Sequence, residues 1–320
     1  MTSSQKALSE SNPKIVQWFV DTRPLWPVQQ AKPRDEVQQL KTVASRALSL
    51  LSESEQASVL KYYHLKDAKM SLVSHLLKRL IITTLDIPWP RSIVSRDSKG
   101  KPCFIPEDCG SHVVLDFNVS HQAGLVSLIA IIGLQGAQVG TDIVCANERL
   151  QQDTTHISKH GFEDWVDMHA DVLADSEVRF MKTVSVDGQP SALGTAVDKE
   201  LRRFYAVWCL REAYVKMTGD ALLAPWLKEL EIRDVQAPAA KEGLDSDSLE
   251  EGEVVRQSSN YFQGEVVADV KMELSAIGAH YMIAGSIRIP QGVDSAGVKL
   301  GKWQKLDFEK DVLKIAEATS

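Results

Sequence analysis

The sequence predicts an α+β protein made of two similar lobes, each with helices packed on a small antiparallel sheet. In the first half, helical periodicity across residues 56–85 precedes strand-like apolar runs between residues 113 and 144. In the second half, a strong helical pattern at 201–218 precedes the strand-like runs "GEVVADVKMEL" and "HYMIAGSIRI". Helices followed by strands are typical of an α+β fold. Because this order occurs twice, we expect a pseudo-two-fold pair of lobes at residues 1–136 and 137–320.

The composition is that of a soluble globular protein. The 320 residues are 44% hydrophobic and 25% charged. No apolar run reaches the roughly 18–20 residues of a membrane span, and the N-terminus lacks the apolar core of a signal peptide. The cysteines are scattered without a CxxC pair, as is typical of reduced thiols. We therefore expect a cytoplasmic protein that has no membrane partner.

The charge is acidic overall but unevenly spread. A net charge of −7 argues against a general nucleic-acid binder. Residues 61–101, however, hold nine lysines and arginines against three acids. Such a segment indicates an anionic ligand or partner, or else an ordinary solvated helix face followed by a charged loop. Charge alone favours the second interpretation.

The first lobe contains a helix, a basic loop and a run of strands. Leucines and Ile81 recur at helical spacing until "DIPWP" ends the helix. "RDSKGKP" is a basic loop. Ser120 and His121 then fall where one strand-like run stops and the next, at 125–132, begins. Polar groups at such a connection can hold an anion, begin catalysis or turn the chain. "QVGTDIV" follows as a third strand, which we expect to pair antiparallel with its neighbour in sequence.

The second lobe adds two polar segments to its helix and strands. Residues 147–199 contain short helical pieces and a loop, "SVDGQPSALGTAVDK". The helix at 201–218 is stopped by Gly219. Residues 237–259 are acidic and carry few large apolar side chains, so we expect a disordered insert there.

Two acidic residues stand out chemically. Asp142 is an acid inside an apolar strand, a costly position unless the carboxylate is paired or binds a cation. Trp208, Glu212 and Lys216 share one helix face at i, i+4 and i+8, although Glu212 and Lys216 alone would be read as an ordinary exposed pair. Together, Asp142 and Glu212 could hold Mg²⁺, which prefers a few carboxylates, waters and phosphate oxygens.

Four stretches, in order, resemble one enzyme family. They are "GKP" at 100–102, "FNVSH" at 117–121, "VGTDI" at 139–143 and "WCLREAYVK" at 208–216. Together with their flanks they cover most of 61–232, and they are similar to the 4′-phosphopantetheinyl transferases. The resemblance is to the long, two-lobe, surfactin-synthetase-activating type, as in fungal members of broad specificity.

The resemblance implies a reaction and its partners. Such an enzyme transfers 4′-phosphopantetheine from coenzyme A to a serine of an acyl or peptidyl carrier protein domain and releases 3′,5′-adenosine bisphosphate. The carriers would serve fatty acid, polyketide, nonribosomal peptide or lysine biosynthesis. The implied enzyme is a monomer that binds coenzyme A between its lobes.

The resemblance also implies residue roles. Asp142 and Glu212 are the ligands of Mg²⁺, or of Mn²⁺ in its place. With Lys216 they form the catalytic set, in which Glu212 is the general base and Lys216 meets the diphosphate. The implied coenzyme A contacts are Lys78, Arg96, Lys101, Pro102, Asn118, Ser120, His121 and Lys216.

Some features depart from the family and keep alternatives open. Many relatives have a second acid two residues after the Asp142 position, where this chain has Val144, and Arg211 replaces a common lysine. Val144 supports an alternative in which the chain is a noncatalytic module that binds carrier proteins or nucleotides. A Ser-His hydrolase built on Ser120 and His121 is a further alternative, disfavoured because no GxSxG motif is present.

Overall fold

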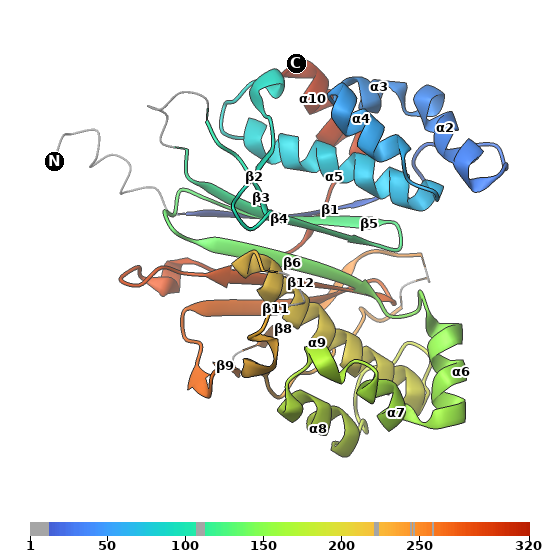
Figure 1. The fold of residues 1–320 in the computed structure, drawn as a ribbon, viewed down its shortest axis with the longest axis vertical. Coiled ribbons are helices and arrows are strands. Elements are labelled where there is room, and N and C mark those ends of the chain that lie inside the picture. Colours follow the sequence, from blue (N-terminus) through green and yellow to red (C-terminus); the bar gives the residue numbers. More distant parts are fainter. Residues whose placement is uncertain (1–12, 107–112, 221–223, 244, 246, 258) are drawn as a thin grey trace. The chain divides into compact units, whose positions relative to one another are not determined.

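The computed structural model divides into two compact units (Figure 1). It describes residues 13–106, 113–220, 224–243, 245, 247–257 and 259–320. Unit 1 comprises Met1–Gln135 and Trp303–Ser320, and unit 2 comprises Gly136–Lys302. Among the helices in the described part of the chain, none is both long enough and apolar enough to span a membrane.

Unit 1 is built on a four-stranded sheet with the order β13-β1-β5-β4. β1 (Lys14–Asp21) pairs antiparallel with β5 (Leu125–Ile132) along all eight residues. β4 (Leu115–Gln122) pairs with the other edge of β5. The β4–β5 hairpin closes through Ala123 and Gly124, whose φ values of 49° and 90° suit a tight two-residue turn.

Helices cover this sheet and supply the core of unit 1. The long helix α5 (Leu65–Thr83) contacts β4 and β5, and its leucines and isoleucines pack with Phe117. A short 3₁₀ turn, Trp89–Arg91, begins within "DIPWP". The other helices are α2 (Pro33–Val43), α3 (Ser45–Ser49) and α4 (Glu53–Leu60). A two-stranded hairpin, β2 (Ser95–Arg96) and β3 (Pro102–Cys103), carries the basic loop.

The C-terminal segment belongs to unit 1, although we expected the second lobe to run to residue 320. β13 (Gln304–Lys305) pairs in parallel with β1. Phe308 then stacks edge-on against Trp26, with ring centroids 4.9 Å apart. A π-helical turn, Phe308–Leu313, leads into α10 (Lys314–Ala318). The segment packs here because its apolar side chains complete the core of unit 1.

Unit 2 is built on a second four-stranded antiparallel sheet with the order β6-β12-β11-β8. β6 (Gln138–Cys145) pairs with β12 (Tyr281–Arg288) along all eight residues, and β11 (Val270–Ile277) follows. We expected "QVGTDIV" to pair with the strand at 125–132, and that was wrong. The sheet-forming partner of β6 lies about 140 residues later in the chain, and sequence adjacency did not indicate it.

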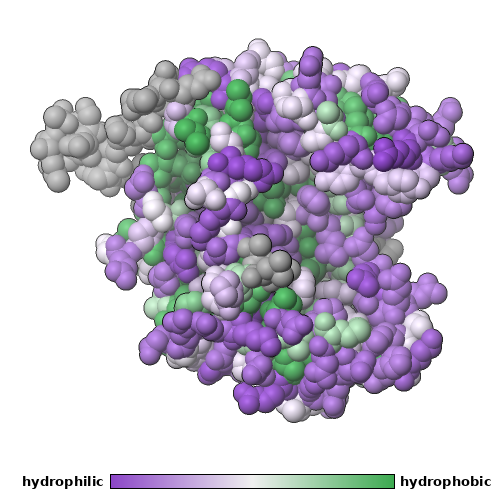
Figure 2. Space-filling model, viewed as in Figure 1, coloured by the Kyte–Doolittle hydropathy of each residue, from purple (hydrophilic) through white to green (hydrophobic). Residues whose placement is uncertain are grey.

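The long helix α9 (Ala196–Thr218) lies against β6, β12 and β11 and ends at Gly219, in the left-handed conformation. Three shorter helices precede it: α6 (Leu150–His160), α7 (Phe162–Asp167) and α8 (Asp175–Thr183). The surface over these helices is mainly hydrophilic in Figure 2. A small sheet contains β7 (Leu230–Ile232), β9 (Asn260–Phe262) and β10 (Glu265–Val266).

The prediction that residues 237–259 are disordered is wrong for most of those that the structure describes. β8 (Glu251–Gln257) is the edge strand of the sheet and pairs with β11. Arg202 of α9 donates to the backbone oxygens of Ala279 and Pro238, at 2.9 and 3.3 Å. Backbone pairing and this buried arginine order the segment, although Leu249 is its one large apolar side chain that is buried among the described residues. Residues 244, 246 and 258 of the predicted insert lie outside the residues that the structure describes.

The two units share one topology, which confirms the predicted pair of similar α+β lobes. Each has a first strand, a long helix and a hairpin: β1, α5 and β4–β5 in unit 1, and β6, α9 and β11–β12 in unit 2. In each, the first strand pairs antiparallel with the second strand of the hairpin. The long helix covers one face of the sheet in both units.

Candidate active site

Asp142 lies in the middle of β6, on the face covered by α9. Gly140, Asp142 and Val144 share this face because side chains alternate along a strand. The Asp142 side chain is 9% exposed, and its Oδ1 accepts a hydrogen bond from Nζ of Lys216 at 2.6 Å. The structure therefore brings together a strand residue and a helix residue that lie 74 positions apart.

Gly140 allows α9 to approach β6 closely. A Cβ atom at Gly140 would lie 2.1 Å from the backbone oxygen of Ala213 and 2.4 Å from the backbone nitrogen of Met217. Oγ of Ser286 donates to the same Ala213 oxygen at 2.8 Å. Ala213 and Met217 each follow a predicted site residue on α9. The close approach thus sets the distance between β6 and the turn that carries Glu212 and Lys216.

The charges at this site favour a cation. Burial, and then the negative charge of Asp142, raise the pKa of Glu212 to about 7, while Lys216 and Arg211 oppose the shift. Burial alone would lower the pKa of Lys216, but Asp142 and Glu212 reverse this and raise it. Two partly dehydrated carboxylates therefore face one ammonium group, and a divalent cation would relieve their mutual repulsion.

The donor set fits Mg²⁺ with two protein carboxylates. Asp142 and Glu212 offer the oxygen ligands that this ion prefers, and waters or phosphate oxygens can complete its octahedron. Val144, on the same strand face, is 3% exposed and belongs to the apolar cluster under α9. Within the described residues, no group of three or more His, Cys, Asp or Glu side chains is placed to hold a metal. The ion would thus depend on ligands from water and substrate.

In unit 1 the basic loop has a defined shape. Backbone N–H groups of Lys99 and Lys101 both donate to Oδ1 of Asp97 at 2.9 Å, and Gly100 has a φ of 86°. Arg96 donates through Nη1 to the backbone oxygen of Gly100 at 2.6 Å. This turn gathers the basic side chains at one end of the β2–β3 hairpin, where Pro102 pairs with Arg96.

Two of the predicted coenzyme A contacts show opposite ways of holding a buried lysine. Lys101 forms an ion pair with Asp116, with Nζ and Oδ2 2.7 Å apart. Lys78 on α5 is 9% exposed. Burial, and then the positive charge of Arg96, lower the pKa of Lys78 to about 8, although Glu55 opposes them. An anion bound near Lys78 and Arg96 would stabilise both positive charges.

Ser120 and His121 lie inside β4, and the turn begins only after Gln122. Neighbouring strand residues point to opposite faces. Ser120 is 5% exposed and shares its face with Asn118, whereas His121 is exposed on the other face. The pair therefore lies within a strand and not in the predicted connection between strands, while the contact of each side chain with coenzyme A stays a prediction. The same arrangement argues against a Ser-His hydrolase, because the two side chains diverge.

Comparisons with known proteins agree on one family. A model described as "4′-phosphopantetheinyl transferase, N-terminal" matches residues 38–132, and one described as "4′-phosphopantetheinyl transferase superfamily" matches residues 138–265. The chain is 42% identical to 4′-phosphopantetheinyl transferase 1 of Fusarium mangiferae over 314 residues, which cover 98% of both chains. This chain belongs to the 4′-phosphopantetheinyl transferase family.

Two further relatives belong to the same family. This chain is 38% identical to a 4′-phosphopantetheinyl transferase of Aureobasidium melanogenum, over 93% of this chain and 96% of the relative. A more distant relative, at 23% identity, is the L-aminoadipate-semialdehyde dehydrogenase-phosphopantetheinyl transferase of Mus musculus, with 82% and 75% coverage. The sequence prediction of the family and the enzyme class is confirmed.

Sequence reasoning missed several residues that shape the site of the transferase. Asp97 organises the basic loop, Asp116 neutralises Lys101, and Gly140 admits α9. The glycine inside a strand was one available signal, because such a glycine often marks a close backbone approach. Asp97 was another, since aspartates in turns often bind backbone N–H groups a few residues on, as this one does. Asp116 gave no signal, because its pairing with Lys101 depends on tertiary structure.

Proposed function

We propose that this transferase moves the 4′-phosphopantetheine group of coenzyme A to a serine of acyl and peptidyl carrier protein domains, and releases 3′,5′-adenosine bisphosphate. The observation that carries the proposal is the cluster of Asp142, Glu212 and Lys216 between β6 and α9. Its residue types suit a reaction at a diphosphate, where negative charge must be neutralised as a P–O bond breaks.

In the proposed reaction the carrier serine oxygen attacks the β-phosphorus of the coenzyme A diphosphate. The serine O–H proton passes to Glu212, directly or through a water, and the bond from phosphorus to the leaving oxygen breaks. A carboxylate whose pKa is about 7 suits a general base near neutral pH. Lys216, held by Asp142, places a positive charge where the diphosphate would lie.

Asp142 and Glu212 would hold Mg²⁺, with Mn²⁺ as a substitute. A bound divalent ion at this pair would neutralise charge on the diphosphate oxygens. Asp142 also orients Lys216 through their 2.6 Å hydrogen bond, so the strand residue serves both the cation and the lysine.

The coenzyme A phosphates are proposed to bind the basic residues of unit 1. The positive charge of Arg96 disfavours the protonated form of Lys78. A phosphate bound between them would offset this repulsion. His121 is exposed, and Lys101 would share its ammonium group between Asp116 and the ligand. The remaining proposed contacts are Pro102, Asn118 and Ser120. The proposal also includes a monomeric, cytoplasmic enzyme.

The carriers are proposed to belong to fatty acid, polyketide and nonribosomal peptide synthesis. The relative from Mus musculus, whose name refers to L-aminoadipate-semialdehyde dehydrogenase, adds a carrier of lysine metabolism as a candidate. The second candidate function is a noncatalytic carrier-binding module, which the apolar, buried Val144 favours.

Mass spectrometry of a purified apo carrier domain, incubated with the transferase, coenzyme A and Mg²⁺, tests the proposal. The expected result is a mass gain of one phosphopantetheinyl group, lost when the carrier serine is replaced by alanine. A carrier that binds the protein but gains no mass would support the noncatalytic module.

A further inference from the structure

Two of the buried arginines on the catalytic helix α9 bind the neighbouring helix α8. Arg203 and Arg211 lie eight residues apart and are 2% and 1% exposed. Positions i and i+8 lie close to the same face of an α-helix. Both arginines contact α8, which belongs to the polar segment 147–199 that precedes α9.

Arg211 is fixed at the start of α8 by four hydrogen bonds. Its Nη2 and Nε donate to Oε2 of Glu177 at 2.7 and 3.2 Å. Nη1 and Nη2 also donate to the backbone oxygens of Leu227 and Leu230, at 2.8 and 2.7 Å. Oε1 of Glu177 accepts from the backbone N–H of Ile232 at 2.9 Å. The pair thus joins α8, α9 and the strand β7 at one buried point.

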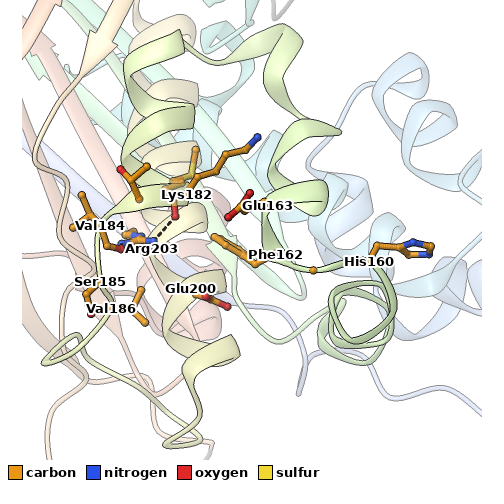
Figure 3. Close-up of a pocket in the computed structure, with 12 residues that line it drawn as sticks. His160, Phe162, Glu163, Lys182, Val184, Ser185, Val186, Glu200 and Arg203 are labelled. Carbon is orange, nitrogen blue, oxygen red and sulfur yellow. Dashed lines mark hydrogen bonds between the residues drawn. The ribbon is translucent and has the colours of Figure 1, made fainter.

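Arg203 is fixed at the other end of α8. Its Nη2 donates to the backbone oxygen of Met181 at 2.5 Å, and its Nη1 to that of Val184 at 2.6 Å. Figure 3 shows Arg203 extending from α9 toward the end of α8, beside a cavity of about 620 Å³ that Glu200 and Phe162 also line. A guanidinium group here satisfies carbonyls at the C-terminal end of α8, where the helix dipole favours a cation.

The two arginines are about as far apart along α9 as their partners are along α8, but the partners follow in the reverse order. Arg203 and Arg211 are separated by about 12 Å along α9, at 1.5 Å per residue. The α8 groups that they bind, from Glu177 to Val184, span about 10 Å on the same scale. The later arginine binds the earlier end of α8, so the helices run antiparallel and are joined at both ends.

We propose that α8 is a brace for the catalytic helix: through Glu177–Arg211 and the Arg203 contacts, it fixes the rotation of α9 so that Glu212 and Lys216 keep facing Asp142. Glu177, Arg203 and Arg211 are positioning residues. Arg211 directly precedes Glu212, so any rotation that moves Arg211 in its socket turns Glu212 by the same angle. This inference rests on the proposed role of Glu212 and gives the 147–199 segment a function.

The test separates positioning from simple stabilisation. A double variant, Glu177→Met with Arg211→Met, replaces the buried ion pair by apolar side chains of similar length, a change that proteins often tolerate without loss of stability. Arg211→Lys keeps the charge and one contact to Glu177. Glu200→Gln, which lines the Arg203 cavity but does not bind α8, is the matched control. If the double variant does not fold, Glu177→Gln takes its place.

Each folded variant is measured for kcat, for KM of coenzyme A, for Mn²⁺ affinity by calorimetry and for hydrogen exchange in residues 208–218. We expect the methionine pair to lower kcat at least tenfold, with KM changed less than threefold, to weaken Mn²⁺ binding and to exchange faster in 208–218. Arg211→Lys should recover most of kcat, and Glu200→Gln should match the parent protein.

A wild-type kcat and unchanged exchange in the methionine pair would overturn the brace. Glu212→Gln, run beside it, separates this result from failure of the proposed function. If Glu212→Gln is inactive while the methionine pair is fully active, the brace alone is wrong. If Glu212→Gln is fully active, the proposed role of Glu212 is wrong, and the exchange and Mn²⁺ results still decide whether α8 holds α9.

Discussion

The first strands of the two units differ at the positions that matter for chemistry. β1 and β6 are both eight residues long and pair in full register with the second strand of their hairpin. Asp142, the fifth residue of β6, corresponds to Trp18 in β1, and Gly140 corresponds to Val16. Unit 1 thus fills the space under its long helix with apolar side chains. Unit 2 has a glycine at one of these positions, against which α9 packs directly, and a carboxylate at the other, so one topology serves as a packed core or as a charged site.

The long helices show a second contrast with a common design. Each has two adjacent charged residues, of which one is neutralised by a glutamate. Arg79 on α5 binds Glu55 at 2.7 Å, and Arg211 on α9 binds Glu177 at 2.7 Å. The neighbours, Lys78 and Glu212, have pKa values shifted toward neutral pH by burial. In each helix, a residue held in a buried ion pair is therefore followed or preceded directly by a charged residue that a ligand of opposite charge would stabilise. Unit 1 presents a cation and unit 2 an anion.

The largest expected effect follows from removing the anion of unit 2. Glu212→Gln should lower transfer at least about 10²–10⁴-fold, the usual contribution of a general base, with further loss from the missing metal ligand. Its melting temperature should not fall, because the change removes a buried carboxylate that is costly to ionise. Carrier modification followed by mass spectrometry measures the first effect, and calorimetric unfolding the second. Turnover within tenfold of the parent would remove Glu212 from the mechanism.

The glycine of unit 2 can be tested against a second glycine in the same sheet. Gly140→Ala must push α9 away from β6 and should cost about 1–3 kcal/mol of stability, as overpacking does. It should also lower kcat about tenfold or more, because Asp142 then loses its place beside Lys216. Gly252→Ala is the control, since its Cβ would meet the backbone oxygen of Ala239 at 2.6 Å, next to Pro238, which contacts α9 through Arg202, ten residues before Glu212. Equal losses of stability with equal kcat values would show that the close approach has no role in activity.

Much of this site could be predicted from local sequence patterns. An acid in an apolar strand and an i, i+4 pair on a helix are both visible without a structure, and Asp142 and Lys216 do meet. The partners of Arg211 could not be predicted, because Glu177 lies 34 residues away and the contact depends on how α8 packs. The same reason explains the C-terminal segment, whose pairing with β1 spans almost the whole chain. The error at Ser120 and His121 was local: the turn needed only the two residues after Gln122.

The cation of unit 1 should control coenzyme A affinity. Lys78→Met is expected to weaken coenzyme A binding about 10–100-fold, as loss of a charge-assisted phosphate contact does. Lys69→Met is the control, because Lys69 is also buried on α5 and burial also lowers its pKa. Calorimetry measures both affinities. Equal affinities for the two variants would place the phosphates elsewhere.

The pKa of Lys78 predicts a proton effect on the same binding. Since burial and Arg96 hold this pKa at about 8, Lys78 is half protonated at pH 8. A phosphate raises the pKa, so binding at pH 8 should take up about half a proton, and much less at pH 6.5. Calorimetry in buffers of different ionisation enthalpy detects the uptake. Its persistence in Lys78→Met would assign the proton to another group.

In unit 2 the pKa of Glu212 is shifted upward, whereas that of Lys78 in unit 1 is shifted downward. The folded pKa of about 7 lies above the usual 4.5, so the folded protein binds more protons than the unfolded one between these values. Stability should therefore fall as pH rises from 4.5 to 7, and this component should be absent in Glu212→Gln. Metal binding needs the deprotonated carboxylate, so Mn²⁺ affinity should rise over the same range. Unfolding curves and Mn²⁺ titrations at several pH values provide the check.

The central claim is that the carboxylate pair of unit 2 holds the divalent ion that transfer requires. The most direct measurement is carrier modification after exhaustive chelation, and again after Mg²⁺ is restored, in the parent protein and in Asp142→Asn. We expect no transfer in the chelated parent, full recovery with Mg²⁺, and little recovery in the variant even at high Mg²⁺. Full activity in the chelated parent, or normal Mg²⁺ rescue of Asp142→Asn, would contradict the claim.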